Sequence, residues 1–192
     1  MTAARDIVSL GLELIKVPSA ANTNLELIRY LSDEFGGQIH LSLGMTTREE
    51  EDMIVRELDG RGRLKDTVLY ACTSGYPVPF DEVYLLEIPR LKRDYGSVVA
   101  GIGFSGHHLG IAIDIAAYAL GATWIERHFT LDRTWKGTDH AASLEPDGLR
   151  RLQRDLLNTC TAMREREQDI SAVEVAQREK LKWKPRSTAA KL

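Results

Sequence analysis

Short apolar runs alternate with longer segments of helical periodicity along most of this chain. The five runs are Leu12–Val17, Ile39–Leu43, Thr67–Cys72, Val98–Phe104 and Ala122–Arg127. Short, nearly continuous apolar runs are typical of strands buried on both faces, which occur in parallel sheets covered by helices. The alternation therefore predicts an α/β fold with about five parallel strands.

The segments between the runs carry apolar residues at spacings of three and four, which predicts helices. We expect them at about 25–35, 46–59, 81 onward, 109–120 and 143–166. Pro89 is expected to kink or break the third helix. Beyond residue 167 the chain is charged and poor in apolar residues. We therefore expect a domain over 1–167 and a flexible tail over 168–192, with 180–191 disordered.

Composition narrows the class of protein. Hydrophobic residues make up 43% and charged residues 28% of the sequence, as in soluble globular proteins. A net charge of −3 gives no basic field for nucleic acid. Cys72 and Cys160 are too few for a disulfide framework and are expected to be reduced. With no signal-peptide pattern and no apolar stretch long enough to span a bilayer, we expect a cytoplasmic protein without a membrane partner.

Polar side chains stand at or just beyond the end of every predicted strand. They are Lys16, Ser19, Ser42, Thr73, Ser74, Ser105, His107, Glu126 and His128. Ligands bind at the carboxyl ends of parallel strands in (β/α) folds, so these side chains are expected to meet at one rim. Hydroxyls and an ammonium suit phosphate or carboxylate. Two imidazoles suit a divalent metal such as Mn²⁺, Zn²⁺, Co²⁺ or Fe²⁺.

Each of these residues also has a purely structural alternative. Lys16 could extend its ammonium into solvent, the serines could be turn or cap residues, and each histidine could be an ordinary loop residue. Glu126 is harder to explain this way, because a buried carboxylate needs a partner. His40, expected to be exposed by strand alternation, and His140 are not expected to be catalytic. Convergence on one rim favours a functional site.

Several longer blocks match the sequence pattern of one family in the same order. They are Lys16–Ser19, Leu41–Thr47, Cys72–Pro79, Gly103–Ile111, Ile125–Arg133 with its H-F-T-L-D-R, and Gly137–Pro146 with its D-H-A-A-S-L-E-P. With these blocks the chain closely resembles the N-acetylneuraminate (sialic acid) synthase family. The resemblance extends from about Asp6 to Leu156.

The resemblance implies part of a TIM barrel, equivalent to strands 4–8, and an enzyme that uses phosphoenolpyruvate. Such enzymes condense it with an N-acyl-hexosamine, such as N-acetylmannosamine, to a nine-carbon 2-keto sugar acid and phosphate. His107 and His128 match metal ligands, for which we expect Mn²⁺, or else Co²⁺ or Mg²⁺. Together with Glu126, a rim carboxylate, they are the candidate catalytic residues. The candidate substrate-binding residues are Lys16, Ser19, Ser42, Ser74, Ser105, Tyr76 and Asp139, the last two matching positions that contact the sugar.

The sequence also departs from the family pattern. Ser105–His108 read S-G-H-H where the family has S-D-H-T, and the asparagine of C-T-S-N-Y-P is replaced at Ser74–Gly75. The resemblance begins near the fourth barrel strand and omits the family's antifreeze-like domain. We therefore expect a homo-oligomer or a complementary half-barrel chain to complete the site. It would cover inward-facing apolar residues, expected to be Ile15, Leu41, Leu69, Ile102 and Ile125. The alternative is a non-catalytic remnant or binding protein.

Overall fold

The computed structural model describes residues 2–183. The chain divides into two compact units, Met1–Cys160 and Thr161–Leu192, and each is described by itself. The predicted boundary at 167/168 stays a prediction.

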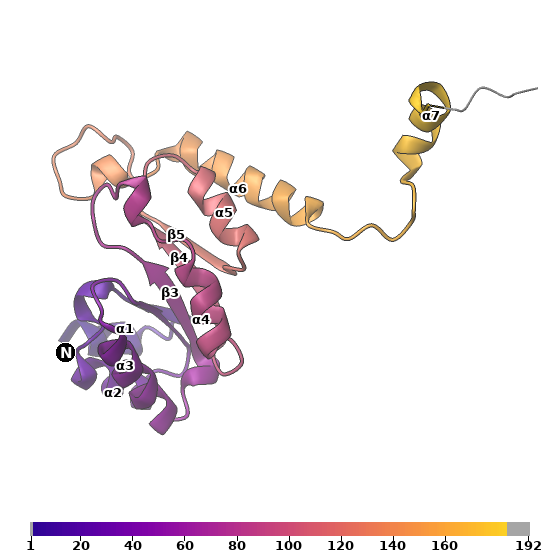
Figure 1. Ribbon diagram of the computed structural model, residues 1–192. Helices are drawn as coiled ribbons and strands as arrows, with labels where there is room; N and C mark the ends of the chain where they lie inside the picture. Colours follow the sequence, from indigo (N-terminus) through magenta and orange to yellow (C-terminus); the bar gives the residue numbers. More distant parts are fainter. Residues whose placement is uncertain (1, 184–192) are drawn as a thin grey trace, which may run out of the picture. The chain divides into compact units, whose positions relative to one another are not determined.

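The first unit is built on one sheet of five parallel strands that follow one another in chain order (Figure 1). The strands are β1 (Leu14–Val17), β2 (Gln38–Ser42), β3 (Thr67–Cys72), β4 (Gly101–Gly106) and β5 (Trp124–Arg127). The helices are α1 (Thr2–Ser9), α2 (Leu25–Glu34), α3 (Arg48–Gly60), α4 (Glu87–Tyr95), α5 (Ala112–Ala119) and α6 (Pro146–Ala162). The sheet curls into a half-barrel flanked by helices, which confirms the predicted fold class.

The sheet has an apolar outer face and an inner face that carries polar and aromatic side chains. The outer face packs with the helices in one core that includes Leu41, Leu69 and Ile102 of the strands and Ile28, Ile54 and Ile88 of the helices. Ile15 belongs to this core and Ile125 packs against it. The prediction that these strand residues face other barrel strands is therefore wrong. Side chains along a strand point alternately to its two faces. Because Lys16 points to the inner face, its neighbour Ile15 points to the outer face.

An aromatic and imidazole layer covers part of the inner face. His40 Nδ1 lies 2.7 Å from Tyr70 Oη, and His40 Nε2 lies 2.8 Å from Gln38 Oε1. The His40 ring also meets Trp124 edge to face, with 4.6 Å between the ring centroids. His40 is thus buried, and the predicted exposure is wrong because this face of β2 is covered as well. A Cβ on Gly103 would lie 2.5 Å from the Tyr70 ring, so the glycine makes room for it.

The helices begin and end close to the predicted positions, with local differences. Thr47 caps α3 through a capping box with Glu50, which confirms the expected capped start. The third predicted helix begins at Glu87 rather than near residue 81, so Pro89 falls in its first turn, where a missing N–H is tolerated. The positive φ of Tyr84, 53°, interrupts any earlier helix. The N-terminal helix α1 was not predicted.

The described part of the second unit begins with the last two residues of α6 and contains one further helix, α7 (Ala172–Leu181). Its start is fixed by Ser171, whose backbone N–H donates to Glu174 Oε2 at 3.1 Å. Of the segment expected to be disordered, 180–191, Lys180 and Leu181 end α7, so the prediction is wrong for them, and residues 184–191 lie outside the described residues. Within residues 2–183, no helix combines the length and apolar character needed to cross a membrane.

Candidate functional site

Four predicted side chains from four strands meet on the inner face, near the strand ends. Lys16 Nζ donates to Ser42 Oγ at 2.7 Å and lies 3.2 Å from Glu126 Oε2. Ser105 Oγ donates to Glu126 Oε1 at 2.9 Å. Glu126 thus has the partners that a partly buried carboxylate requires. These four residues therefore meet at one rim, as predicted.

The two candidate metal ligands lie side by side just beyond β4 and β5. The ring centroids of His107 and His128 are 5.0 Å apart, and the rings are nearly perpendicular. His107 Nδ1 lies 2.8 Å from the carbonyl oxygen of Thr73, which can only accept, so Nδ1 carries the proton and Nε2 is the nitrogen able to bind a metal. His128 Nδ1 lies 3.4 Å from Asp139 Oδ2.

The donor set therefore fits part of a divalent metal site. Hydrogen-bonded second partners are what orient ligating histidines in metal sites. Among residues 2–183, however, no group of three or more His, Cys, Asp or Glu side chains is arranged to hold an ion. Two imidazoles would need further ligands from substrate, water or another segment.

Electrostatics distinguish the two imidazoles. Burial lowers the pKa of His128, and the nearby His107 lowers it further, which favours the neutral form that binds metals. For His107, burial acts in the same direction, but contacts with Cys72 and the Thr73 carbonyl outweigh it and raise the pKa. Burial likewise opposes ionisation of Cys72, yet contacts with His107 and Ser19 lower the pKa of this thiol. Cys72, although it ends the third predicted strand, was not chosen from the sequence.

Ser19 and Ser74 meet over the backbone of the loop after β2. Ser19 Oγ accepts from the Gly44 N–H at 3.2 Å and lies 3.5 Å from Cys72 Sγ. A Cβ on Gly44 would approach both Ser19 Oγ and Ser74 Oγ, at 2.5 and 2.7 Å. Ser74 Oγ is buried and has no hydrogen-bond partner within the described part of the chain, so it can bond a ligand atom.

These residues enclose a small hollow at the rim, of about 90 Å³. It is lined by Lys16, Pro18, Ser19, Ala20, Ser42, Met45, Cys72, Tyr76, Ser105, His107, Glu126 and His128. The Tyr76 ring lies against both imidazoles, with centroid distances of 4.5 Å to His107 and 5.6 Å to His128. Eight of the ten predicted site residues line this hollow. Asp139 contacts His128 beside it, and Ser74 lines a neighbouring cleft.

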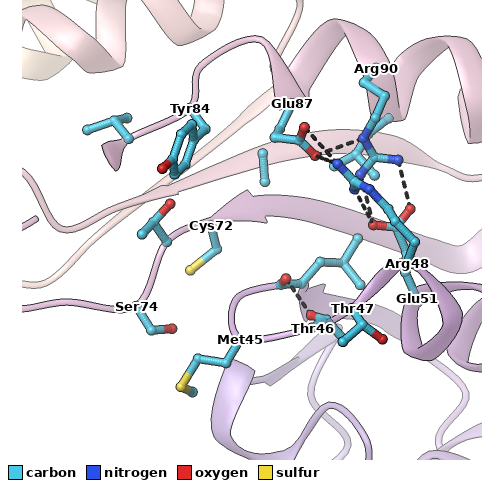
Figure 2. A pocket seen from close by; sticks show the side chains of 15 residues that line it. Met45, Thr46, Thr47, Arg48, Glu51, Cys72, Ser74, Tyr84, Glu87 and Arg90 are labelled. Atoms are coloured by element: carbon cyan, nitrogen blue, oxygen red, sulfur yellow. Dashed lines mark hydrogen bonds and ion pairs between the residues drawn. The ribbon is translucent and has the colours of Figure 1, made fainter. Parts of the chain in front are cut away.

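That neighbouring cleft, of about 620 Å³, was not predicted from the sequence (Figure 2). It shares Met45 and Cys72 with the small hollow. Figure 2 shows Ser74 and Cys72 on one side and a group of charged side chains on the other. These charges come from α3 and α4 and are paired with one another, Arg90 with Glu51 and Glu87 at 2.8 Å each. The cleft therefore extends the rim without adding an unpaired charge.

Comparison with known proteins assigns the family. The sequence model described as "NeuB family" matches residues 1–168. The chain belongs to the NeuB family. It is 39% identical over 157 residues to the N,N'-diacetyllegionaminic acid synthase of Campylobacter jejuni, covering 81% of this chain and 44% of that protein. It is 35% identical over 175 residues to the human N-acetylneuraminate-9-phosphate synthase, covering 90% of this chain and 46% of that protein.

Solved structures agree with this assignment. The N-acetylneuraminic acid (sialic acid) synthetase of Leptospira borgpetersenii, crystallised with citrate, superposes with a TM-score of 0.76 and 30% identity, over 92% of this chain and 61% of that one. A DAHP synthase from Thermotoga maritima, at 16% identity and a TM-score of 0.69, shares the fold alone. The chain spans about half the length of the curated relatives it matches. The predicted family is therefore confirmed.

Proposed function

We propose that this chain supplies the anion- and metal-binding rim of a sugar-acid synthase. The proposed reaction condenses phosphoenolpyruvate with an N-acyl-hexosamine, such as N-acetylmannosamine, to a nine-carbon 2-keto sugar acid and phosphate. The observation that carries this proposal is the meeting of Lys16, Ser42 and Glu126 with the imidazoles of His107 and His128 at one hollow. Membership of the NeuB family supports the reaction class.

In this reaction a carbon–carbon bond forms between the methylene carbon of phosphoenolpyruvate and the aldehyde carbon of the open-chain sugar. Water adds to the carbon that bears the phosphate ester, and departure of phosphate leaves the ketone. Lys16 and the hydroxyls of Ser19, Ser42, Ser74 and Ser105 would hold the anionic groups. Because Lys16 already pairs with a carboxylate, an incoming anion must compete with Glu126 for the ammonium.

We propose that His107 and His128 hold a divalent metal, Mn²⁺ in the first place and Co²⁺ or Mg²⁺ as alternatives. When bound, such an ion supplies Lewis-acid polarisation of the sugar carbonyl. The chain's own residues prepare the imidazoles for this role, since the Thr73 carbonyl holds one ring and Asp139 lies against the other. Tyr76, which lines the hollow, and Asp139, which contacts His128 beside it, would contact the sugar.

A further strand-bearing segment is proposed to complete the site, either in a second copy of this chain or in a complementary half-barrel chain. Among the described strands, β1 and β5 each pair with one neighbour only, so both present unpaired backbone groups at a sheet edge. The two-imidazole donor set also needs additional ligands. Both features point to residues from outside these five strands.

The decisive experiment is an assay with phosphoenolpyruvate, N-acetylmannosamine and Mn²⁺, in which phosphate and 2-keto acid are both quantified. It is performed on the purified chain alone and with any chain that co-purifies with it. Equal amounts of both products, absent with Lys16→Met and retained with the exposed control Lys65→Met, would support the proposal. A folded chain that binds neither phosphoenolpyruvate nor Mn²⁺ would instead favour the non-catalytic alternative.

A further inference from the structure

A buried ionic cluster includes the chain neighbours of both imidazoles, His108 and Arg127. Arg127 Nη1 lies 2.5 Å from Asp114 Oδ2 and 3.1 Å from His108 Nε2. The exposed fractions of these side chains are 2% for Arg127 and 0% for both Asp114 and His108. The cluster connects the end of β5 with the first turn of α5 and with the loop after β4.

The guanidinium also donates to backbone carbonyls on separate segments. Arg127 Nη2 donates to the carbonyl of His108 at 2.7 Å and to that of Ala142 at 3.3 Å, and Nη1 donates to the carbonyl of Gly110 at 2.8 Å. The planar, five-donor guanidinium can make such contacts in several directions at once, whereas an ammonium group cannot reproduce the fork.

The segments joined by Arg127 are the ones that carry the metal-site residues. His108 directly follows His107, and Arg127 directly precedes His128. Ala142 ends a short 3₁₀ helix, His140–Ala142, whose N-cap is Asp139, the partner of His128. One side chain therefore holds the backbone next to both imidazoles and the end of the short helix that Asp139 precedes.

Stability alone does not account for a cluster of this kind. Burying an ion pair removes two charges from water, and well-packed apolar side chains are often as stabilising or more so. Three buried polar atoms here, Arg127 Nε, Asp114 Oδ1 and His108 Nδ1, have no hydrogen-bond partner within the described residues. A buried cluster with this cost in desolvation is better explained by the arrangement of the backbone that it imposes.

We propose that Arg127, anchored by Asp114, is a positioning residue that sets the separation and orientation of the His107 and His128 rings. This inference rests on the proposed function insofar as the two rings are metal ligands. The positioning itself is independent of any metal, because all the contacts that produce it are within the chain.

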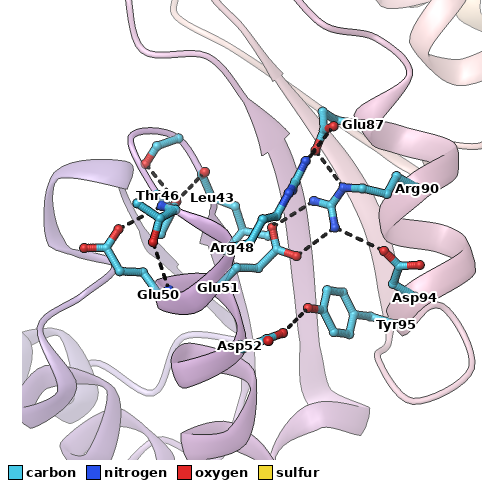
Figure 3. A network of polar contacts seen from close by, with 12 residues as sticks. Leu43, Thr46, Arg48, Glu50, Glu51, Asp52, Glu87, Arg90, Asp94 and Tyr95 are labelled. Carbon is cyan, nitrogen blue, oxygen red and sulfur yellow. Dashed lines mark hydrogen bonds and ion pairs between the residues drawn. The ribbon is translucent and has the colours of Figure 1, made fainter.

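A matched control exists elsewhere in the same unit. Arg90 bonds to Glu51 and Glu87 between α3 and α4, is 16% exposed, and touches neither imidazole (Figure 3). Replacing Arg90 also breaks a largely buried arginine–carboxylate network. It should therefore affect folding stability without changing the histidine geometry.

The test compares Arg127→Lys and Asp114→Asn with Arg90→Lys in the full chain. The first readout is the nuclear Overhauser effect between ring protons of His107 and His128 in histidine-labelled protein, which their 5.0 Å centroid separation makes observable. The second is Mn²⁺ affinity, from the loss of the free-ion electron paramagnetic resonance signal. Circular dichroism verifies that each variant is folded.

We expect the ring-to-ring signal to weaken in both cluster variants and to persist in Arg90→Lys. Mn²⁺ affinity should fall about tenfold or more in the cluster variants, the effect typical of residues that orient metal ligands. A folded Arg127→Lys or Asp114→Asn that keeps both the wild-type ring signal and the wild-type Mn²⁺ affinity would overturn the inference. If wild type binds no Mn²⁺, the metal site fails, while the ring signal still decides the positioning role.

Discussion

Lys16 on β1 and Glu126 on β5 form an ion pair, with 3.2 Å between Nζ and Oε2, although β1 and β5 are the two edge strands of the sheet. The curl of the sheet brings their inner-face side chains together across the three strands between them. A flat sheet would hold these strands about 19 Å apart, four spacings of roughly 4.8 Å. The rim is thus a property of the curvature as much as of the residues.

The ion pair predicts opposite effects of its two partners on anion binding. Lys16→Met should weaken phosphoenolpyruvate binding about tenfold or more, since a charge-assisted contact is lost. Glu126→Gln should strengthen phosphoenolpyruvate binding about fivefold, because it removes the carboxylate that competes for the ammonium. This factor corresponds to the attraction between two such charges in a largely aqueous setting. Calorimetric titration measures both, with Glu26→Gln on the surface as control. Weakening by both variants would contradict the competition between Glu126 and the ligand.

Metal binding should depend on both rim histidines, His107 and His128, and not on His140. His107→Ala and His128→Ala are each expected to abolish measurable Mn²⁺ binding, because two imidazoles are already a minimal donor set. His140→Ala should leave the affinity unchanged, since His140 bonds to Thr130 rather than to the rim. Titration with Mn²⁺ distinguishes these outcomes, and equal binding by wild type and His128→Ala would exclude the assignment.

The inner face should not tolerate a side chain at Gly103. Gly103→Ala is expected to lower the free energy of unfolding by about 1–3 kcal/mol, because its Cβ would overlap the Tyr70 ring. Gly60→Ala, at the end of α3 with nothing within 4 Å of the added Cβ, should stabilise by about 0.4–1 kcal/mol. Urea unfolding measures both. Tyr70→Leu should reduce the penalty at position 103, and full additivity of the two substitutions would show that the ring is not the cause.

Acidification should destabilise the first unit through His40. Burial, followed by the charge of Lys16, lowers the pKa of His40 below its ordinary value of 6.5. A histidine with a depressed folded-state pKa stabilises the fold above 6.5, and this contribution is lost as the pH falls through the folded-state pKa. Urea unfolding at about pH 7.5 and about pH 5.5 should therefore show a loss that is smaller in His40→Asn. An identical loss in the variant would mean that other groups carry the pH dependence.

Self-association or a partner chain should be detectable in solution. Sedimentation at low micromolar concentration is expected to give a mass above the 21.5 kDa of one chain. The sheet edges have unpaired backbone groups, and Leu14 and Trp124 at these edges are 41% and 40% exposed. Leu14→Lys should reduce the mass more than Leu149→Lys on α6. A cooperative monomer that binds no hydrophobic-surface dye would refute this expectation.

The strands and the rim could be predicted because both follow from local patterns. An apolar run such as Thr67–Cys72 identifies a buried strand, and the ends of parallel strands meet at one edge of the sheet. The pattern could not show which face of β2 points to the inside of the half-barrel, because residues on both faces of this strand are buried. That is why Leu41 and His40 were both assigned to the wrong environment.

The role of Arg127 and the charged wall of the large cleft were beyond sequence reasoning for another reason. Arg127 acts through the carbonyls of His108, Gly110 and Ala142. Every residue has a backbone carbonyl, so such acceptors cannot be recognised from the sequence. The cleft is lined by Tyr84 and by residues of α4, and the positive φ of Tyr84 just before that helix cannot be recognised from the residue pattern. Both features require coordinates.

For the proposed synthase, the loop after β2 is the place where substrate preference can be altered. Gly44 is enclosed by the short side chains of Ser19, Cys72 and Ser74, so a library that randomises this position would mostly yield misfolded rims. Its neighbour Met45 is 66% exposed and lines both the small hollow and the neighbouring cleft. With a φ of 57°, that position favours glycine and asparagine, whose side chains are smaller than that of methionine and would leave more room in both the hollow and the cleft. Directed evolution of the proposed synthase toward bulkier acceptors should therefore begin at residue 45.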